Sequence, residues 1–140
     1  MATMFLKATA VGGNVFVTLP DGDRPYDYEI HSVYAYYESK GPPTGARQVR
    51  ITAEDPDGDT IMITGGDTQP VNTVRHYMTF PQAVLERVPN GDDIQWMPWP
   101  GVAVVPGGTV IRVKNVAQTT PNDIARVFVQ YDTTRASRGA

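Results

Sequence analysis

Cysteine is absent from this chain of 140 residues, and serine and histidine are scarce. Without cysteine, the chain has no disulfide, no thiolate nucleophile and no cysteine-ligated zinc. No apolar run approaches the length of a membrane span. The net charge is −3, and no basic stripe of the kind that binds DNA or RNA is visible. We therefore expect neither a membrane nor a nucleic acid as a partner.

The first residues of the given sequence do not have the order of a signal peptide. Met1–Lys7 places its charge after a very short apolar patch, which is the reverse of a signal peptide. We therefore expect the protein to be made and kept in the cytoplasm, or to leave it only as part of something larger.

Candidate catalytic residues are few. The only serines are Ser32, Ser39 and Ser137, and none lies in a nucleophile-elbow motif. His31 and His76 lie in predicted strands without an acidic residue at metal-ligand spacing, so the favoured interpretation is a partly buried histidine with a satisfied hydrogen bond. No carboxylate pair occupies an apolar setting that would raise a pKa for general-acid catalysis. We predict no catalytic residues, no cofactor and no metal site.

One acidic cluster, Glu54–Asp59, resembles a calcium ligand set. Asp55, Asp57 and Asp59 occupy alternate positions, and calcium binds several converging carboxylate oxygens. However, Gly58 precedes the third aspartate, whereas in an EF-hand loop the glycine follows it. A solvated hairpin turn, in which glycine supplies a positive φ, is the favoured interpretation, and calcium binding stays an open alternative.

Alternation of apolar and polar residues is the clearest pattern in the chain. Thr109–Asn115 and Ala125–Asp132 both alternate with a period of two, which predicts strands that are apolar on one face and solvated on the other. The predicted core residues of this pair are Ile111, Val113, Val127, Val129 and Tyr131.

Comparable segments occur throughout the chain, separated by turn signals. Within Tyr28–Glu38 the apolar phase changes near His31 and Ser32, which predicts a β-bulge. About eight strands and almost no helix predict an all-β fold, with residues 1–140 forming a single antiparallel β-sandwich. Jelly-roll connectivity is favoured, and an immunoglobulin-like arrangement is the alternative. The further predicted strands are Val15–Leu19, Tyr28–Glu38, Gln48–Ala53, Thr60–Thr64, Thr73–Phe80 and Ile94–Trp99.

The two ends of the chain differ in character. Residues 1–10 carry an apolar patch that could form an opening hairpin strand or an N-terminal arm against a partner. Residues 133–140 lack apolar anchors, which predicts a flexible C-terminal tail.

Aromatic residues concentrate at two places. Trp96 and Trp99 lie three residues apart beside prolines, so in polyproline II geometry they would point the same way. They could close the core, anchor a subunit interface or stack a sugar ring. Tyr34 and Tyr36 share one face of a predicted strand, opposite Tyr37. The residues that we expect at a partner interface are Phe5, Tyr36, Trp96 and Trp99.

Several stretches together are similar to a known family over about residues 28–132. They resemble the small β-sandwich virion proteins encoded in the structural gene clusters of tailed bacteriophages. The resemblance concerns strand and turn residues, and it implies structural assembly with no catalytic residue to carry over. The matching stretches are Tyr28–Tyr34, Thr44–Ile51, Asp57-Gly58, Pro106–Val113, and Asn122–Ile124 before the strand that ends at Tyr131.

This resemblance implies a non-enzymatic protein located in the virion and made in the host cytoplasm. We expect a capsid decoration (cement) protein that binds the major capsid protein or other virion proteins and forms a homo-oligomer. A tail or head–tail connector component is the alternative within the same class. A carbohydrate-binding β-sandwich module that uses Trp96 and Trp99 is an alternative from a different class.

Overall fold

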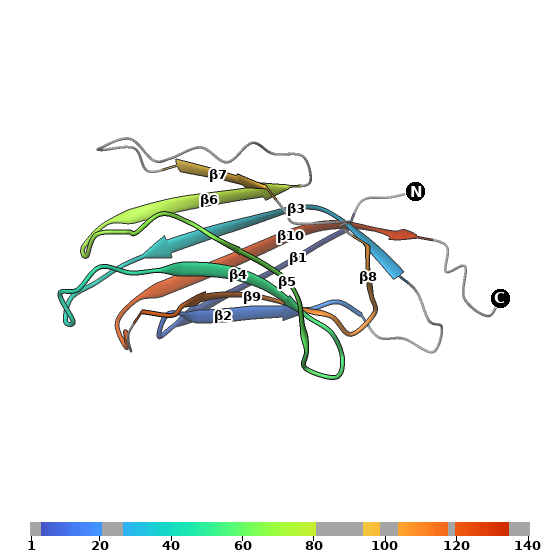
Figure 1. The fold of residues 1–140 in the computed structure, drawn as a ribbon, viewed down its shortest axis with the longest axis horizontal. Coiled ribbons are helices and arrows are strands. Elements are labelled where there is room, and N and C mark those ends of the chain that lie inside the picture. The colour runs from blue at the N-terminus through green and yellow to red at the C-terminus, as the bar shows by residue number, and fades with distance from the viewer. Residues whose placement is uncertain (1–3, 21–26, 81–93, 99–103, 118–119, 135–140) are drawn as a thin grey trace.

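The computed structural model describes residues 4–20, 27–80, 94–98, 104–117 and 120–134, which contain ten β-strands and no helix (Figure 1). No helix long and apolar enough to cross a membrane is therefore found in these ranges. The strands are β1 (Met4–Val11), β2 (Asn14–Thr18), β3 (Asp27–Glu38), β4 (Val49–Glu54), β5 (Thr60–Gly65), β6 (Val74–Phe80), β7 (Ile94–Pro98), β8 (Val104–Pro106), β9 (Val110–Asn115) and β10 (Ile124–Thr134).

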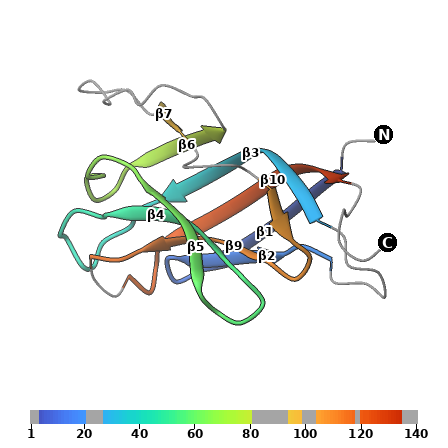
Figure 2. The same cartoon turned by 45° about the vertical axis from the view of Figure 1, so that its right-hand side comes forward.

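The strands form two sheets that pack face to face (Figures 1 and 2). Sheet A has the order β1-β10-β3-β6-β7, with β8 pairing to the first residues of β3. Sheet B has the order β2-β9-β4-β5. Neighbouring strands are antiparallel except for β6 and β7, which run parallel.

The path of the chain between the sheets identifies the connectivity. From β1 in sheet A the chain passes to β2 in sheet B, to β3 in sheet A, and to β4 and β5 in sheet B. It then returns through β6 in sheet A and β9 in sheet B to β10 in sheet A. This is the path of a jelly roll, with β1-β10-β3-β6 facing β2-β9-β4-β5. The predicted sandwich is confirmed, and β7 and β8 are additions between β6 and β9.

The core lies between the sheets and is built from the inward phase of each strand. All five core residues predicted for β9 and β10 are buried there. The segment of residues 1–10, which could be a hairpin strand or an arm, contributes to strand β1 (Met4–Val11), and the inward side chains of this strand pack against the core. Burial of apolar surface supplies the main favourable term in folding.

The phase change in β3 has the predicted cause. Gln130 of β10 pairs with Ser32, and the next residue, Tyr131, pairs with Ile30. His31 is therefore the extra residue of a β-bulge, which lets Ile30 and Val33 both face the core. The His31 Nε2 atom lies 2.7 Å from a carboxylate oxygen of Asp132.

The acidic cluster forms the predicted hairpin turn between β4 and β5. One carboxylate oxygen of Asp55 accepts hydrogen bonds from the backbone N–H groups of Asp57 (3.0 Å) and Asp59 (2.9 Å). Gly58 has φ near +90°, a conformation that glycine adopts without steric cost. Asp55 is thus a structural residue of the turn.

A fully buried ion pair holds one end of the sandwich together. The Nε atom of Arg47, in the loop before β4, donates to Asp123 at 2.7 Å, and a second guanidinium nitrogen donates to the other carboxylate oxygen at 3.1 Å. The Tyr37 hydroxyl (2.6 Å) and the Lys40 amide (2.8 Å) also donate to this carboxylate. Arg47 donates further to the backbone carbonyls of Gly45 and Lys40. These hydrogen bonds to groups of the same chain replace the water that the buried pair has lost.

The buried side-chain amide of Gln69 extends this network to β6. The Gln69 side chain donates to the carbonyls of Tyr37 (2.9 Å) and Thr73 (3.1 Å) and accepts from the Tyr77 hydroxyl (2.8 Å). The backbones of Gln69 and Arg47 also exchange two hydrogen bonds. Burial raises the pKa of Tyr77 to about 12, so this hydroxyl stays a donor at neutral pH.

The network changes the acidity of its members. Burial by itself would raise the pKa of Asp123, but hydrogen bonds from Arg47, the Lys40 amide and Tyr37 outweigh burial and hold this pKa below its ordinary value. Burial, together with the bond to Asp123, raises the pKa of Tyr37. At neutral pH the buried carboxylate is therefore ionised and the phenol is neutral.

We expect Arg47→Met to lower the free energy of unfolding by about 3–5 kcal/mol, because the substitution leaves a buried carboxylate without its counter-charge. Arg112→Met is the matched control. Arg112 pairs with Glu54 at a partly exposed position, so its loss should cost about 1 kcal/mol or less. Urea unfolding followed by circular dichroism measures both values, and equal losses would contradict the assigned role of the buried pair.

We also expect an acid-dependent loss of stability that depends on Asp123. Its native pKa lies below the unfolded value of about 3.9, so the carboxylate stabilises the fold above that pH. This contribution is lost as the pH falls through the depressed native pKa. The free energy of unfolding, measured in urea at a series of pH values, should therefore fall more steeply below about pH 4 in the wild type than in Asp123→Asn. Parallel pH profiles would rule out this linkage.

Candidate functional site

The outer face of sheet A carries a continuous set of aromatic and apolar side chains. Strand alternation turns these residues away from the core, and sheet pairing brings them together from five strands. We call this surface the aromatic face, and it consists of Phe5, Tyr34, Tyr36, His76, Met78, Ile94, Trp96 and Phe128.

Two neighbouring rows of register partners cross this face. In the first row, Phe128 pairs with Tyr34, Tyr34 with Met78, and Met78 with Trp96. Partners in adjacent strands lie close enough for their side chains to interact, so the row is one contact surface. Trp96 is 40% exposed at its outer end, in strand β7.

The second row runs parallel to the first. Arg126 pairs with Tyr36, Tyr36 with His76, and His76 with Ile94. The Arg126 guanidinium lies over the Tyr36 ring, 4.8 Å from its centroid, a cation–π arrangement. This row therefore places a positive charge against the aromatic rings.

Ring contacts hold the two rows in place. The Phe5 and Phe128 rings lie 5.2 Å apart between centroids. The His76 ring stacks on Tyr34 at 5.7 Å and meets Tyr36 edge-on at 5.5 Å. These rings are therefore largely set before any partner arrives, which reduces the entropy that binding would remove.

A hollow of about 270 Å³ lies at the β6–β7 side of the aromatic face, lined by Tyr34, His76, Met78, Ile94 and Trp96. Within it, the Tyr34 hydroxyl and the Nδ1 atom of His76 are hydrogen-bonded to each other. Burial raises the pKa of Tyr34, so the phenol is neutral at physiological pH. The polar groups of the lining thus partly satisfy one another, and the hollow suits an apolar side chain.

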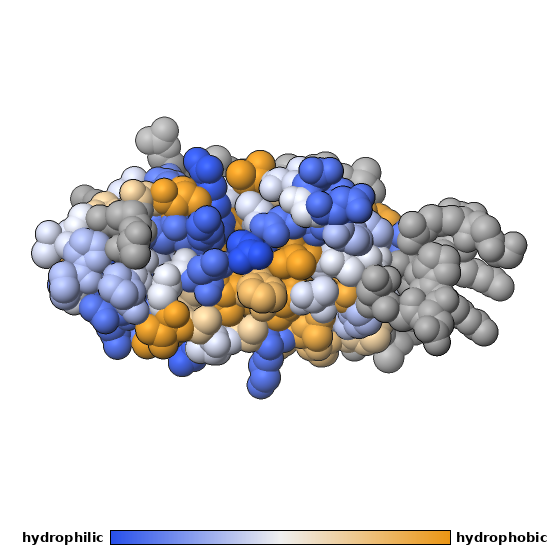
Figure 3. Space-filling model, turned by 90° about the horizontal axis from the view of Figure 1, so that it is seen from below, coloured by the Kyte–Doolittle hydropathy of each residue, from blue (hydrophilic) through white to orange (hydrophobic). Residues whose placement is uncertain are grey.

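Apolar side chains also reach the surface along the edge strands. Phe5 and Val11 of β1 and Phe16 of β2 are all more than half exposed. Seen from the side on which β2 lies in Figure 1, hydrophobic residues gather in the middle of the surface, between hydrophilic ones (Figure 3). No group of three or more potential metal ligands occurs in the described ranges.

Three of the four residues predicted at a partner interface lie on one surface. Phe5, Tyr36 and Trp96 all belong to the aromatic face, whereas Trp99 lies outside the described residues. For Trp96, the interpretation as a core residue is wrong, because its side chain points outward and is 40% exposed.

Sequence reasoning missed other members of this face. Sequence analysis does not single out Phe128, Met78 and Ile94, although all three lie in predicted strands. The available signal was an apolar residue in the phase opposite to the core, as at Phe128 between Val127 and Val129.

Comparisons with known proteins show similarity of structure and none of sequence. No family profile and no curated protein matches the chain. A chain of the Nora virus structure aligns with 99% of this chain at 16% identity and a TM-score of 0.37, and 60% of that chain is covered. A chain of the structure of infectious bursal disease virus Gx strain aligns with 98% of this chain at 12% identity and a TM-score of 0.33. This chain spans 37% of that second chain.

The aromatic face should contribute less to folding than the core does. Phe5→Ala removes a side chain that is 55% exposed and meets one other ring, so we expect it to lower the free energy of unfolding by about 1 kcal/mol. Ile30→Ala, at a core position that is 1% exposed, should cost about 2–5 kcal/mol. Urea unfolding of both variants tests this, and comparable losses would mean that Phe5 is a structural residue.

Proposed function

We propose that this chain is a non-enzymatic virion structural protein of a tailed bacteriophage, a capsid decoration protein that binds assembled heads through its aromatic face. The partner surface belongs to the major capsid protein or to another virion protein. A tail or head–tail connector position is the alternative within the same class.

This proposal rests on the residue types that gather on the aromatic face. Aromatic residues, methionine and arginine are enriched at protein interfaces, and tryptophan, tyrosine and arginine dominate their binding energy. Trp96, Tyr36, Met78 and Arg126 stand together on this one surface. Contiguous apolar surface of this kind marks an interaction site.

The architecture supports the same proposal at a general level. Jelly rolls occur in viral capsid domains and in lectins, but a fold alone does not set a function. The resemblance to phage virion proteins over residues 28–132 points to this class of protein. It rests on residues of β3, β4, β9 and the start of β10 and on the loops and turn beside these strands.

Binding to a particle also requires only moderate affinity at each contact. A decoration protein meets many symmetry-related sites on one head, and linked copies gain affinity from the high local concentration of sites. The aromatic face therefore does not need the area of a permanent dimer interface to occupy a head fully.

The hollow beside Trp96 favours a second candidate, a carbohydrate-binding module that stacks a sugar on the indole. Sugar recognition also needs several polar groups around the ring, and here the Tyr34 hydroxyl and His76 are bonded to each other. Protein recognition is therefore the better match. Titration of tryptophan fluorescence with a panel of oligosaccharides separates the two, since a saturable response would favour the sugar module.

We expect the purified protein to co-sediment with empty heads of the phage that encodes it and to raise their melting temperature. Trp96→Ala should weaken this binding at least about tenfold, because it removes an anchor of the aromatic face. Phe16→Ala is the matched control, since Phe16 is similarly exposed but lies on the outer face of sheet B, and it should bind as the wild type does.

Two results would count against the proposal. One is that wild-type protein neither binds the heads nor shifts their melting temperature. The other is that Trp96→Ala and Phe16→Ala bind equally well, which would move the contact away from the aromatic face.

A further inference from the structure

Strand β5 forms one edge of sheet B, and within the described part of the chain it pairs only with β4. An edge strand presents backbone N–H and C=O groups that can pair with another chain, and lysine or proline commonly protects such edges. Thr60–Gly65 contains neither residue. Ile61 and Ile63 on this strand are instead 42% and 50% exposed.

Opposite charges lie at the two ends of this edge. Before β5, the turn places Asp57 and Asp59 at exposed positions, while the Asp55 carboxylate is occupied within the turn. At the other end, Arg50 of β4 is the register partner of Gly65. A Cβ atom on Gly65 would lie 3.6 Å from the Cγ of Arg50, so the arginine side chain passes beside Gly65 at this edge.

Among the described residues, Arg50 has no internal counter-charge. Its register partner on β9 is Lys114, and like charges directly opposite each other on a sheet repel. In the described part of the chain, no carboxylate lies within ion-pair distance of either residue. Arg112, by contrast, pairs with Glu54 at 3.0 Å.

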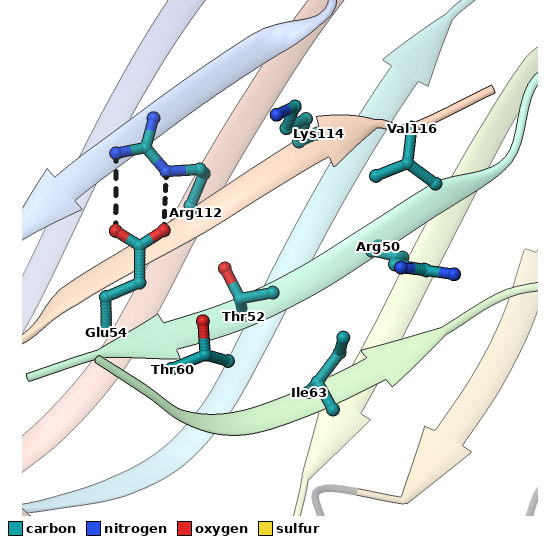
Figure 4. Close-up of a pocket in the computed structure, with 8 residues that line it drawn as sticks. All are labelled: Arg50, Thr52, Glu54, Thr60, Ile63, Arg112, Lys114 and Val116. Carbon is teal, nitrogen blue, oxygen red and sulfur yellow. Dashed lines mark hydrogen bonds and ion pairs between the residues drawn. The ribbon is translucent and has the colours of Figure 1, made fainter. Parts of the chain in front are cut away.

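These residues line one groove of about 370 Å³ on the outer face of sheet B. In Figure 4 the Arg112–Glu54 pair lies at one end of the groove, and Arg50, Lys114 and Val116 lie toward the other. Ile63 of β5 lines the groove as well. The uncompensated positive charge therefore sits next to an exposed apolar strand edge.

We propose that β5 is a homodimer interface, in which two copies of this chain pair antiparallel along β5 about a two-fold axis. Such an isologous contact requires a surface that is complementary to itself. Antiparallel pairing brings the Asp57–Asp59 turn of one copy beside Arg50 of the other, twice in the dimer. Ile61 and Ile63 of both copies then cover one another, and sheet B continues through both subunits. This interface is independent of the aromatic face and does not rest on the proposed function.

The charges of this edge favour a second copy of the chain as its binding partner. Arg50 is exposed and can accept an anionic partner, and the exposed acids of this same edge supply one at the matching position in a two-fold arrangement. The apolar part of the contact is also self-complementary, because Ile61 and Ile63 occupy the middle of the edge between the two charged ends.

Sedimentation velocity over a series of protein concentrations at low salt tests the interface. We expect a monomer–dimer equilibrium in the wild type. Arg50→Asp and Asp59→Arg should each weaken dimerisation at least about tenfold, because each places like charges together across the axis. The double variant Arg50→Asp/Asp59→Arg exchanges the two charges and should restore the dimer toward the wild-type affinity.

Arg50→Asp should not destabilise the monomer. Arg50→Asp places an acid opposite Lys114 and so relieves a repulsion within the monomer. Lys7→Asp is the matched control, since it makes the same change in net charge at an exposed position on β1 of sheet A and should leave dimerisation unchanged. Ile61→Lys tests the edge separately, because two lysines would meet near the axis, and it should also weaken the dimer.

A wild-type protein that remains monomeric at all concentrations would overturn the proposal. So would a dimer that Arg50→Asp, Asp59→Arg and Ile61→Lys leave intact, since the contact would then lie elsewhere. Binding of Trp96→Ala and Arg50→Asp to heads distinguishes this result from failure of the proposed function, because only Trp96→Ala alters the aromatic face.

Discussion

At one end of the sandwich, the guanidinium of Arg47 and the carboxylate of Asp123 lie fully buried and bonded to each other through two hydrogen bonds. A buried charge is tolerated only when partners replace the water that it loses, and here Tyr37 and the Lys40 amide complete the set. The loop that leaves β3, the segment that precedes β4 and the residue that precedes β10 must therefore all be in place together. Through Gln69 the same constraint extends to β6.

The two outer faces of the sandwich are available for binding. The core is complete between the sheets, so the aromatic residues of sheet A and the charged groove of sheet B are not needed to fill it. The faces differ in chemistry. One is aromatic, with the Arg126 guanidinium over the Tyr36 ring, and the other carries Arg50 and Lys114, which have no carboxylate partner among the described residues, beside an apolar edge. Under the two proposals, a subunit binds a partner through one surface and a second copy through the other.

Much of the fold could be predicted because its signals are local. Alternation identified the core residues of β9 and β10, the phase change in β3 located the bulge at His31, and the acidic turn followed from Asp and Gly. The network around Arg47 was not foreseen, although Arg47 and Asp123 both lie in stretches that carry the resemblance to phage virion proteins. A lone arginine before a strand has no sequence signature of burial, because burial depends on a partner 76 residues away.

The sequence alone determined that the protein is a β-sandwich, where most of its strands lie and which side of β9 and β10 faces the core, because each of these depends on side chains two residues apart. In β6 the buried side chains include Arg75 and Thr79, so alternation of apolar and polar residues did not indicate its inward face. Only the tertiary structure decided the jelly-roll path, the partner of Arg47 and the gathering of Phe5, Tyr36 and Trp96 on one surface. Those outcomes depend on strand order and register. A shift of one residue would turn every side chain of a strand to the opposite face, and no short stretch of sequence contains both strands of a pair.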